Sequence, residues 1–136
     1  MYVFPIYDLT QKKVSDLHLS ATDPPMYLSI ERNEYDKSAN THFFIIEVGV
    51  QKEANFVTKH TLRYRYSQLL QLDQQLQSFF KENNIINPFP PKNYFRSNSE
   101  LFVQKRQEDL QKYLDILTKT PDIIKVQAFR DYFELD

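Results

Sequence analysis

The stretch NPFPPKNYF, residues 87–95, restricts the backbone more than any other part of this sequence. Proline fixes its own φ angle, lacks an amide donor and pushes the preceding residue toward an extended conformation. Pro88, Pro90 and Pro91 therefore predict a stiff, polyproline-like connection and exclude the interior of a helix or a central strand. We call residues 87–92 the proline-rich arm.

Three segments before the arm alternate apolar and polar residues with the period of a half-buried strand. They are MYLSIER (26–32), HFFIIEVGV (42–50) and residues 55–63, and the polar stretch NEYDKSANT (33–41) predicts a turn between the first two. Three short strands with polar links predict an antiparallel meander. Residues 1–25 are expected to be an N-terminal extension packed on a domain of residues 26–136.

Apolar residues then recur with helical spacing on both sides of the arm. One helix is expected after Ser67 as N-cap, a second after the capping box Ser97–Glu100, and a third from Thr120-Pro121. The predicted buried helix positions are Leu69, Leu72, Leu76, Phe79 or Phe80, Val103, Leu110, Tyr113, Leu114, Leu117, Ile123, Val126, Phe129 and Phe133. We predict an α+β fold: a three-stranded antiparallel β-meander packed against three to four helices, with a polyproline connection.

The composition argues against an enzyme. The chain has no Cys, three scattered His residues and a single glycine, Gly49, so it predicts no thiolate or histidine metal site, no thiol nucleophile and no glycine-rich phosphate loop. No cofactor is expected. No apolar run approaches the length of a membrane span, and we expect a soluble, cytoplasmic domain.

The charge is unevenly distributed although the net charge is only −1. Residues 51–106 hold nine Lys or Arg against four Asp or Glu, whereas the rest of the chain holds eight against fourteen. This asymmetry indicates a basic surface for an anionic partner, and a Lys-rich solvated surface is the alternative. A nucleic-acid binder would need a broader basic face, so we expect no nucleic-acid partner.

Three cations lie at places that a purely structural role explains poorly. Arg65 comes just before a helix start, where free amides and the macrodipole favour an anion. Arg106 interrupts an apolar row, and Lys92 ends the arm. The alternatives are a solvated strand edge for Arg65 and snorkelling for Arg106. Tyr94 and Phe95 follow the arm and predict contact with a partner or a membrane, or else packing on the core.

In this order, the motifs resemble those of the Phox-homology (PX) domain, the phosphoinositide-binding module of sorting nexins. RYSQLLQLDQQL is similar to the family's Arg-Tyr-Ser segment, INPFPPK to its bulky-Pro-x-x-Pro-x-Lys pattern, and RQEDLQKYL to its last basic motif. When the second pattern is aligned on Lys92, Asn87 stands where the family has its first proline.

The resemblance implies a head-group pocket for phosphatidylinositol 3-phosphate. Arg65 would bind the 3-phosphate, Tyr66 would lie under the inositol ring, Lys92 would contact the 1-phosphate and Arg106 the ring hydroxyls at positions 4 and 5. Acceptance of a second phosphate through Lys105 or Arg63 stays open.

Tyr94 and Phe95 fall where the family's membrane-insertion loop begins. The resemblance therefore implies a peripheral protein on the cytosolic face of endosomal or vacuolar membranes, with protein partners through the rest of a parent chain. The alternative is a protein-interaction module that uses the PX scaffold or the arm from Pro88 to Pro91, which fits an aromatic-lined groove.

Overall fold

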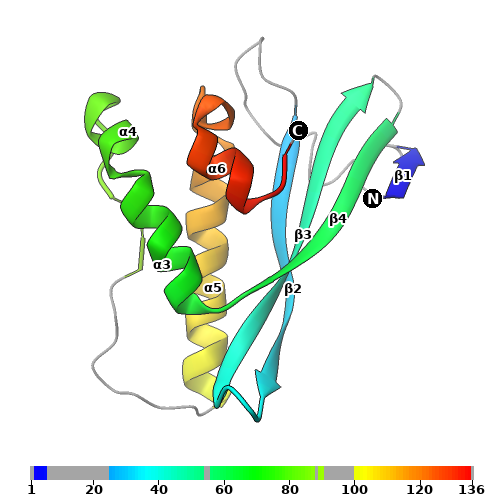
Figure 1. The fold of residues 1–136 in the computed structure, drawn as a ribbon, viewed down its shortest axis with the longest axis vertical. Coiled ribbons are helices and arrows are strands. Elements are labelled where there is room, and N and C mark those ends of the chain that lie inside the picture. The colour runs from blue at the N-terminus through cyan, green and yellow to red at the C-terminus, as the bar shows by residue number, and fades with distance from the viewer. Residues whose placement is uncertain (1, 6–24, 54–55, 88, 91–99, 136) are drawn as a thin grey trace.

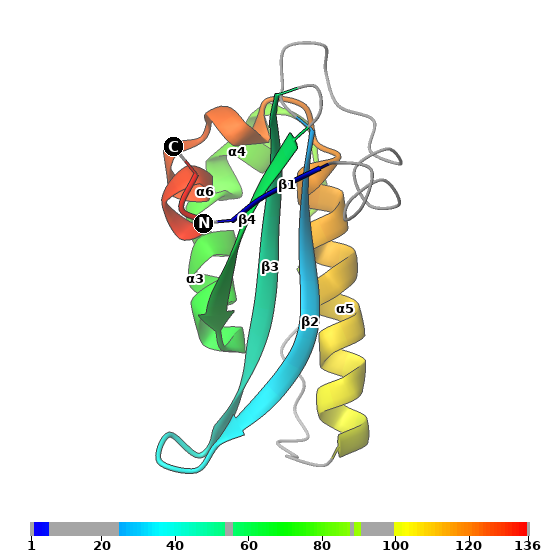
Figure 2. The same cartoon turned by 90° about the vertical axis from the view of Figure 1, so that its right-hand side faces the viewer.

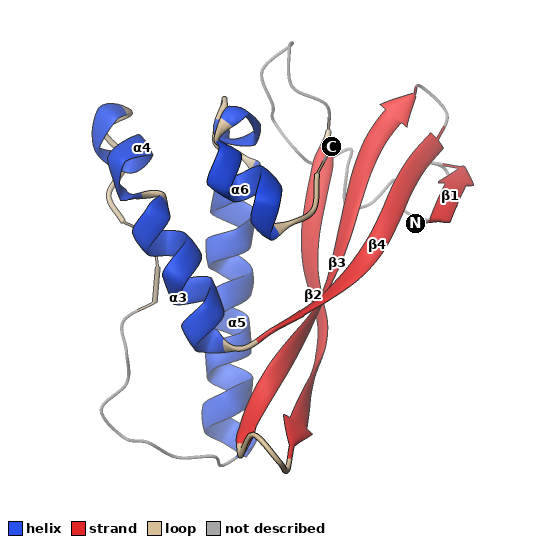
Figure 3. Ribbon diagram, in the orientation of Figure 1, coloured by secondary structure: helices blue, strands red, loops and turns tan. Residues whose placement is uncertain are grey.

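The chain folds into an antiparallel sheet with helices on one side (Figure 1, Figure 3). The computed structural model describes residues 2–5, 25–53, 56–87, 89–90 and 100–135. The elements are β1 (Tyr2–Pro5), β2 (Met26–Asp36), β3 (Thr41–Glu53), β4 (Phe56–Tyr64), α3 (Tyr66–Gln75), α4 (Gln77–Glu82), α5 (Glu100–Thr118), the 3₁₀ helix η1 (Ile123–Lys125) and α6 (Gln127–Tyr132). Strands come first and helices afterwards, so the predicted α+β class is confirmed.

The described sheet has one strand more than expected. Its order is β1-β4-β3-β2, and β2, β3 and β4 form the predicted meander. The short strand β1, from the N-terminal extension, pairs antiparallel with the start of β4. The division between extension and domain at residue 25 stays a prediction. The first hairpin is longer than expected, because β2 continues through Asn33–Asp36 before a tight turn.

The core lies between the sheet and the helices. Phe44, Ile46, Val48 and Val50 of β3 are all buried in it, as the period of two predicts. The helices lie on one side of the sheet (Figure 2). By the same period of two, the intervening side chains of β3 belong to the opposite, outer face. The helix positions predicted to be buried are also in the core or packed against it.

Two glutamine side chains fix α5 against the edge strand β2. The Gln111 amide accepts from the Ile30 N–H at 2.7 Å and donates to the Leu28 carbonyl at 2.9 Å, so it hydrogen-bonds the edge as a neighbouring strand would. One turn earlier, the Asn33 amide donates to Gln107 at 2.7 Å. These contacts set the rotation of α5 and therefore the direction of Arg106.

Two predicted helix starts are wrong. Arg65, not Ser67, is the N-cap of α3, because Arg65 is still extended and the Gln68 side chain accepts its N–H at 2.9 Å. No helix starts at Thr120-Pro121: the chain turns there through Asp122, whose φ is +69°, before η1 and α6. Ser97 of the predicted capping box lies outside the described residues, and α5 begins at Glu100.

Candidate functional site

Arg65 joins β4 to α3. It has φ −96° and ψ 168°, so it continues the extended strand while its carbonyl already accepts from the first turn of the helix. Its side chain is exposed. Within the described ranges, no carboxylate or carbonyl oxygen pairs with its guanidinium. The positive charge therefore stands at the positive end of a helix dipole, where an anion is stabilised by both.

Arg106 lies in the apolar row of α5, which predicts that its side chain needs a partner. That partner is a pair of aromatic rings. Its Cζ lies 3.9 Å from the centre of the Tyr66 ring and 4.7 Å from that of the Phe102 ring. Burial lowers the pKa of the Arg106 guanidinium, and the Tyr66 side chain acts in the opposite direction. An arginine starts from a pKa above 12, so Arg106 stays charged. The rings orient the guanidinium and leave its donors available.

Tyr66 connects the two cations to the proline-rich arm. Its ring packs beside that of Phe89, with centroids 5.3 Å apart, and its hydroxyl donates to the Pro90 carbonyl at 3.0 Å. Burial raises the pKa of the Tyr66 hydroxyl while Arg106 lowers it. The hydroxyl stays a neutral donor, and the described part of the arm is held against α3.

The structure places Arg106 on the ring of Tyr66, the residue that follows Arg65, and we call these three residues the helix-start cluster. Lys92, Tyr94 and Phe95 lie outside the described residues, so their roles stay predictions. Phe102 belongs beside the cluster but was not singled out by the sequence reasoning.

Two other basic side chains, on β4 and α5, have acidic partners. On the outer face of the sheet, Arg63 pairs with Asp36 at 2.8 Å and its Cζ lies 3.6 Å from the centre of the Phe43 ring. Lys105, next to Arg106, pairs with Asp109 at 3.1 Å. The two residues left open as ligands of a second phosphate are therefore already neutralised.

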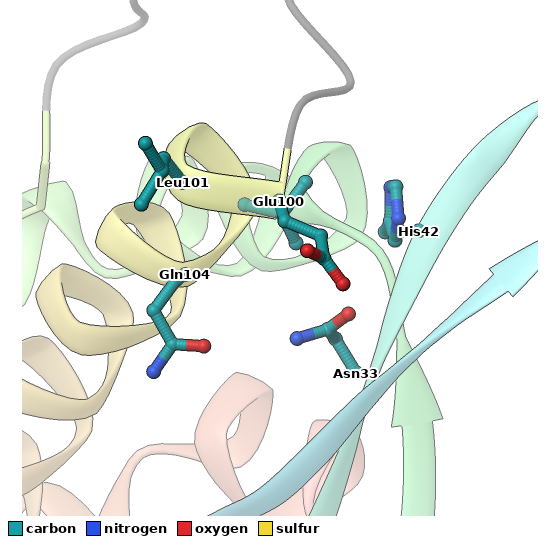
Figure 4. A pocket seen from close by; sticks show the side chains of 6 residues that line it. Asn33, His42, Glu100, Leu101 and Gln104 are labelled. Carbon is teal, nitrogen blue, oxygen red and sulfur yellow. The ribbon is translucent and has the colours of Figure 1, made fainter.

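A separate pocket of about 340 Å³ lies between the first turn of α5 and the strands β2 and β3 (Figure 4). Its lining residues are Asn33, His42, Glu100, Leu101, Val103 and Gln104. Among the described residues, its lining has no lysine or arginine and one carboxylate, so this part of it lacks the charge that a phosphate needs. Arg65, Tyr66 and Arg106 do not line it.

The described residues contain no cluster of three or more His, Cys, Asp or Glu side chains that could hold a metal ion. Among the described helices, none has the length and apolar character needed to cross a bilayer.

The comparison with protein families decides the classification. The model of the PX domain matches residues 54–136, more than half of the sequence. The chain belongs to the PX domain family. The match begins before β4 and includes every described residue of the helix-start cluster and of the arm, so this PX domain carries its cations on the segments that the family model covers.

Relatives of this PX domain are sorting nexins. Sorting nexin-31 of Mus musculus is 33% identical over 73 residues, which cover 54% of this chain and 16% of the relative. Sorting nexin-17 of Danio rerio is 34% identical over 101 residues, which cover 67% of this chain and 21% of the relative. The PX domain therefore spans only about a fifth or less of the length of these relatives.

Solved PX domains share the fold. A designed CISK-PX domain superimposes with a TM-score of 0.62 at 20% identity, covering 79% of this chain and 97% of that one. The mouse SNX19 PX domain with a bound sulphate ion gives 0.60 at 18% identity, covering 83% and 99%. The solved structures show the fold, and the family match with the sorting nexin relatives supports a phosphoinositide-binding module and indicates no enzymatic family.

Proposed function

We propose that this PX domain targets its parent protein to endosomal membranes by binding phosphatidylinositol 3-phosphate in a pocket formed by Arg65, Tyr66, Lys92 and Arg106. The observation that carries the proposal is the stacking of Arg106 on Tyr66, directly beside Arg65, with no acidic partner for either guanidinium within the part of the chain that the structure describes.

The two guanidinium groups suit different parts of the head group. Arg65 is exposed at the start of α3, so a phosphate can receive its bidentate donors and the field of the helix together. Arg106 is half-buried and held on a ring, which favours short contacts to neutral hydroxyl groups. Lys92 follows Pro90 by two residues, a separation that an extended chain spans in about 7 Å.

The pairing of the neighbouring cations supports a single ring phosphate besides the one that joins the lipid tail. A second ring phosphate would need another cation, and both Arg63 and Lys105 would first have to leave Asp36 and Asp109. Breaking an exposed pair of this kind costs up to about 1 kcal/mol, so a second phosphate gains less there than at an unpaired guanidinium. We therefore expect phosphatidylinositol 3-phosphate to be preferred over bis-phosphorylated lipids.

The contacts of the arm support the lipid role over a proline-ligand role. A proline-rich ligand must present its rings and prolines to the groove of a partner. Here the Phe89 ring packs on the core and the Pro90 carbonyl accepts from Tyr66. The described part of the arm is thus used within the domain.

Membrane binding would combine the pocket with a hydrophobic contact. Tyr94 and Phe95 are proposed to enter the interface between lipid head groups and tails, and Leu101, which is 84% exposed at the start of α5, adds apolar surface. Basic residues near an anionic leaflet contribute roughly 1 kcal/mol each. Since each contribution is weak alone, binding would be reversible and would need the correct lipid.

The test is sedimentation with vesicles of phosphatidylcholine and phosphatidylserine, with and without phosphatidylinositol 3-phosphate. Arg65→Ala is expected to abolish the sedimentation that depends on this lipid and to leave the thermal unfolding temperature unchanged. Arg63→Ala is the matched control: it removes the same group two residues away, from the outer face, and should retain binding.

Equal binding by wild type and Arg65→Ala would refute the pocket. If the wild-type protein sedimented with no phosphoinositide vesicle, the protein-interaction alternative would be favoured instead. Stronger sedimentation with a bis-phosphorylated lipid would refute the proposed preference for one ring phosphate.

A further inference from the structure

A buried carboxylate lies behind the helix-start cluster. Asp73 of α3 is only 2% exposed. Its oxygens accept three hydrogen bonds: from the Tyr113 hydroxyl at 3.0 Å, from Gln77 Nε2 at 2.9 Å and from Asn87 Nδ2 at 3.1 Å. Within the described ranges, no lysine, arginine or histidine pairs with it. Burial raises the pKa of Asp73 although these hydrogen bonds act in the opposite direction.

Burying a carboxylate costs free energy of folding, and its hydrogen bonds offset this cost only in part. An apolar side chain of similar size would fill the same space between α3 and α5 without the cost of removing a carboxylate from water. Two donors, Gln77 and Tyr113, come from helices that the core already holds in place. The third, Asn87, comes from the proline-rich arm, outside the helices.

Asn87 is hydrogen-bonded at both ends of its amide. Its Nδ2 donates to Asp73, and its Oδ1 accepts from the Phe89 N–H at 2.9 Å. One side chain therefore fixes the turn at the start of the arm and ties that turn to α3. Proline, which stands at this place in the family's pattern, has no side-chain donor and restricts the backbone instead.

The rest of the described arm contacts the same group of residues. The Phe89 ring meets the Tyr113 ring edge-on at 4.8 Å, and Tyr113 also donates to Asp73. The Pro90 carbonyl accepts from Tyr66, whose ring carries Arg106. Hence Asp73, the arm and the helix-start cluster form one continuous set of contacts.

We propose that Asp73, Asn87 and Tyr113 form a latch that positions the described part of the proline-rich arm against the helix-start cluster. These are positioning residues, because none of them would touch the lipid. This inference rests on the proposed lipid site for its effect on binding, but the docking of the arm can also be measured without lipid.

Asn87→Ala is the main test. The variant keeps the net charge and changes an exposed residue, so the fold and the attraction to an anionic membrane should be unaffected. Affinity for vesicles containing phosphatidylinositol 3-phosphate should fall about tenfold, the loss expected if the competent conformation drops to about a tenth of the molecules. Asn83→Ala is the matched control, because the Asn83 side chain, at the end of α4, donates to the Phe79 carbonyl at 2.9 Å and to no residue of the described arm.

An exchange of the two side chains adds a rescue. Asn87→Asp places a second carboxylate beside Asp73, and Asp73→Asn puts amide hydrogens where donors now point; each should weaken binding. The double variant restores one donor and one acceptor with the original net charge. Its loss of binding free energy should therefore be smaller than the sum of the losses in the two single variants.

The second readout is the rate of tryptic cleavage after Lys92, which requires no lipid. Asn87→Ala should accelerate it, while Asn83→Ala and Arg65→Ala should not. Should the wild-type protein bind no phosphoinositide, the proposed function fails and the cleavage rate alone decides on the latch. Unchanged cleavage in Asn87→Ala would overturn the latch, as would unchanged affinity in a protein that does bind the lipid.

Discussion

Two regions of this PX domain carry arginine on aromatic rings, and they differ in one respect. In the helix-start cluster, Arg106 lies on Tyr66 beside Arg65, with no acidic partner among the described residues. On the outer face of the sheet, Arg63 lies on Phe43 and also pairs with Asp36 at 2.8 Å. Nearby, Lys59 pairs with Glu47 at 3.1 Å, and Glu47 also accepts from the buried Tyr27 hydroxyl at 2.7 Å.

The difference shows why a count of basic residues does not locate an anion site. A ring orients a guanidinium without neutralising it, whereas a carboxylate occupies the donors that a phosphate would use. The ion pairs on the outer face stabilise the sheet, whereas the guanidinium groups of the helix-start cluster can still bind an anion. Where a cation has an acidic partner, we expect a substitution to affect stability more than lipid binding.

Among these comparisons of paired and unpaired cations, the largest loss of lipid affinity is expected for Arg106→Ala. Loss of a charge-assisted hydrogen bond costs about 1.5–3 kcal/mol, which corresponds to roughly a ten- to hundredfold loss of affinity for phosphatidylinositol 3-phosphate. Surface plasmon resonance on immobilised vesicles would measure it. The control is Lys105→Ala, which removes the neighbouring positive charge but one paired with Asp109.

Lys105→Ala should change the affinity by less than about fivefold, the contribution of one basic side chain near an anionic surface. Equal losses for the two variants would mean that only the total charge matters. The distinction between paired and unpaired cations would then fail.

A smaller effect is expected when the second ring beside Arg106 is removed. Phe102→Ala deletes a contact worth about 0.5–1 kcal/mol at an exposed site, so the affinity should fall about two- to fivefold. Phe43→Ala deletes the ring under Arg63 and should leave the affinity unchanged. A loss of binding in Phe43→Ala, with its melting temperature retained, would show that the outer face also takes part.

Periodicity predicted most of the fold, because the core selects residues at regular intervals. The β3 residues Phe44, Ile46 and Val48 and the α5 residues Leu110 and Leu114 are buried as expected. The helix starts failed for local reasons. Ser67 is a common capping residue, but the Gln68 side chain accepts the Arg65 N–H, so the N-cap lies two residues earlier. Glutamine three residues after the N-cap is one half of the capping-box pattern, and arginine at the N-cap concealed it.

The candidate site was only partly predictable. Arg106 was identified because it breaks an apolar row, and the row also implies that it needs a neighbour. Phe102 was missed although it lies four residues before Arg106, on the same face of α5. That spacing was the available signal. Asp73 could not have been found in this way, since its donors come from positions 4, 14 and 40 residues away.

The smallest expected effect concerns two carboxyl groups with opposite shifts. Hydrogen bonds from Ser38, from the Ala39 N–H and from Arg63 hold the pKa of Asp36 well below its usual value. Burial raises the pKa of Asp73. A folded-state pKa below the unfolded value of about 3.9 stabilises the fold above that pH, and the stabilisation is lost as the pH falls. A raised pKa has the opposite sign: the free energy of unfolding decreases as the pH rises above about 4.

Urea unfolding of the wild type, Asp36→Asn and Asp73→Asn between about pH 3 and pH 7 would separate the two contributions. The deficit of Asp36→Asn relative to the wild type should be largest at neutral pH and should close in acid. For Asp73→Asn, the free energy of unfolding relative to the wild type should instead rise from acid to neutral pH, whatever its offset. The pH-independent part of this difference in free energy of unfolding reports the lost hydrogen bonds. Its change with pH reports the buried charge. Parallel curves for Asp73→Asn and the wild type would show that the three donors already compensate the burial of Asp73. In that case the latch would hold its carboxylate without the cost that we assign to it.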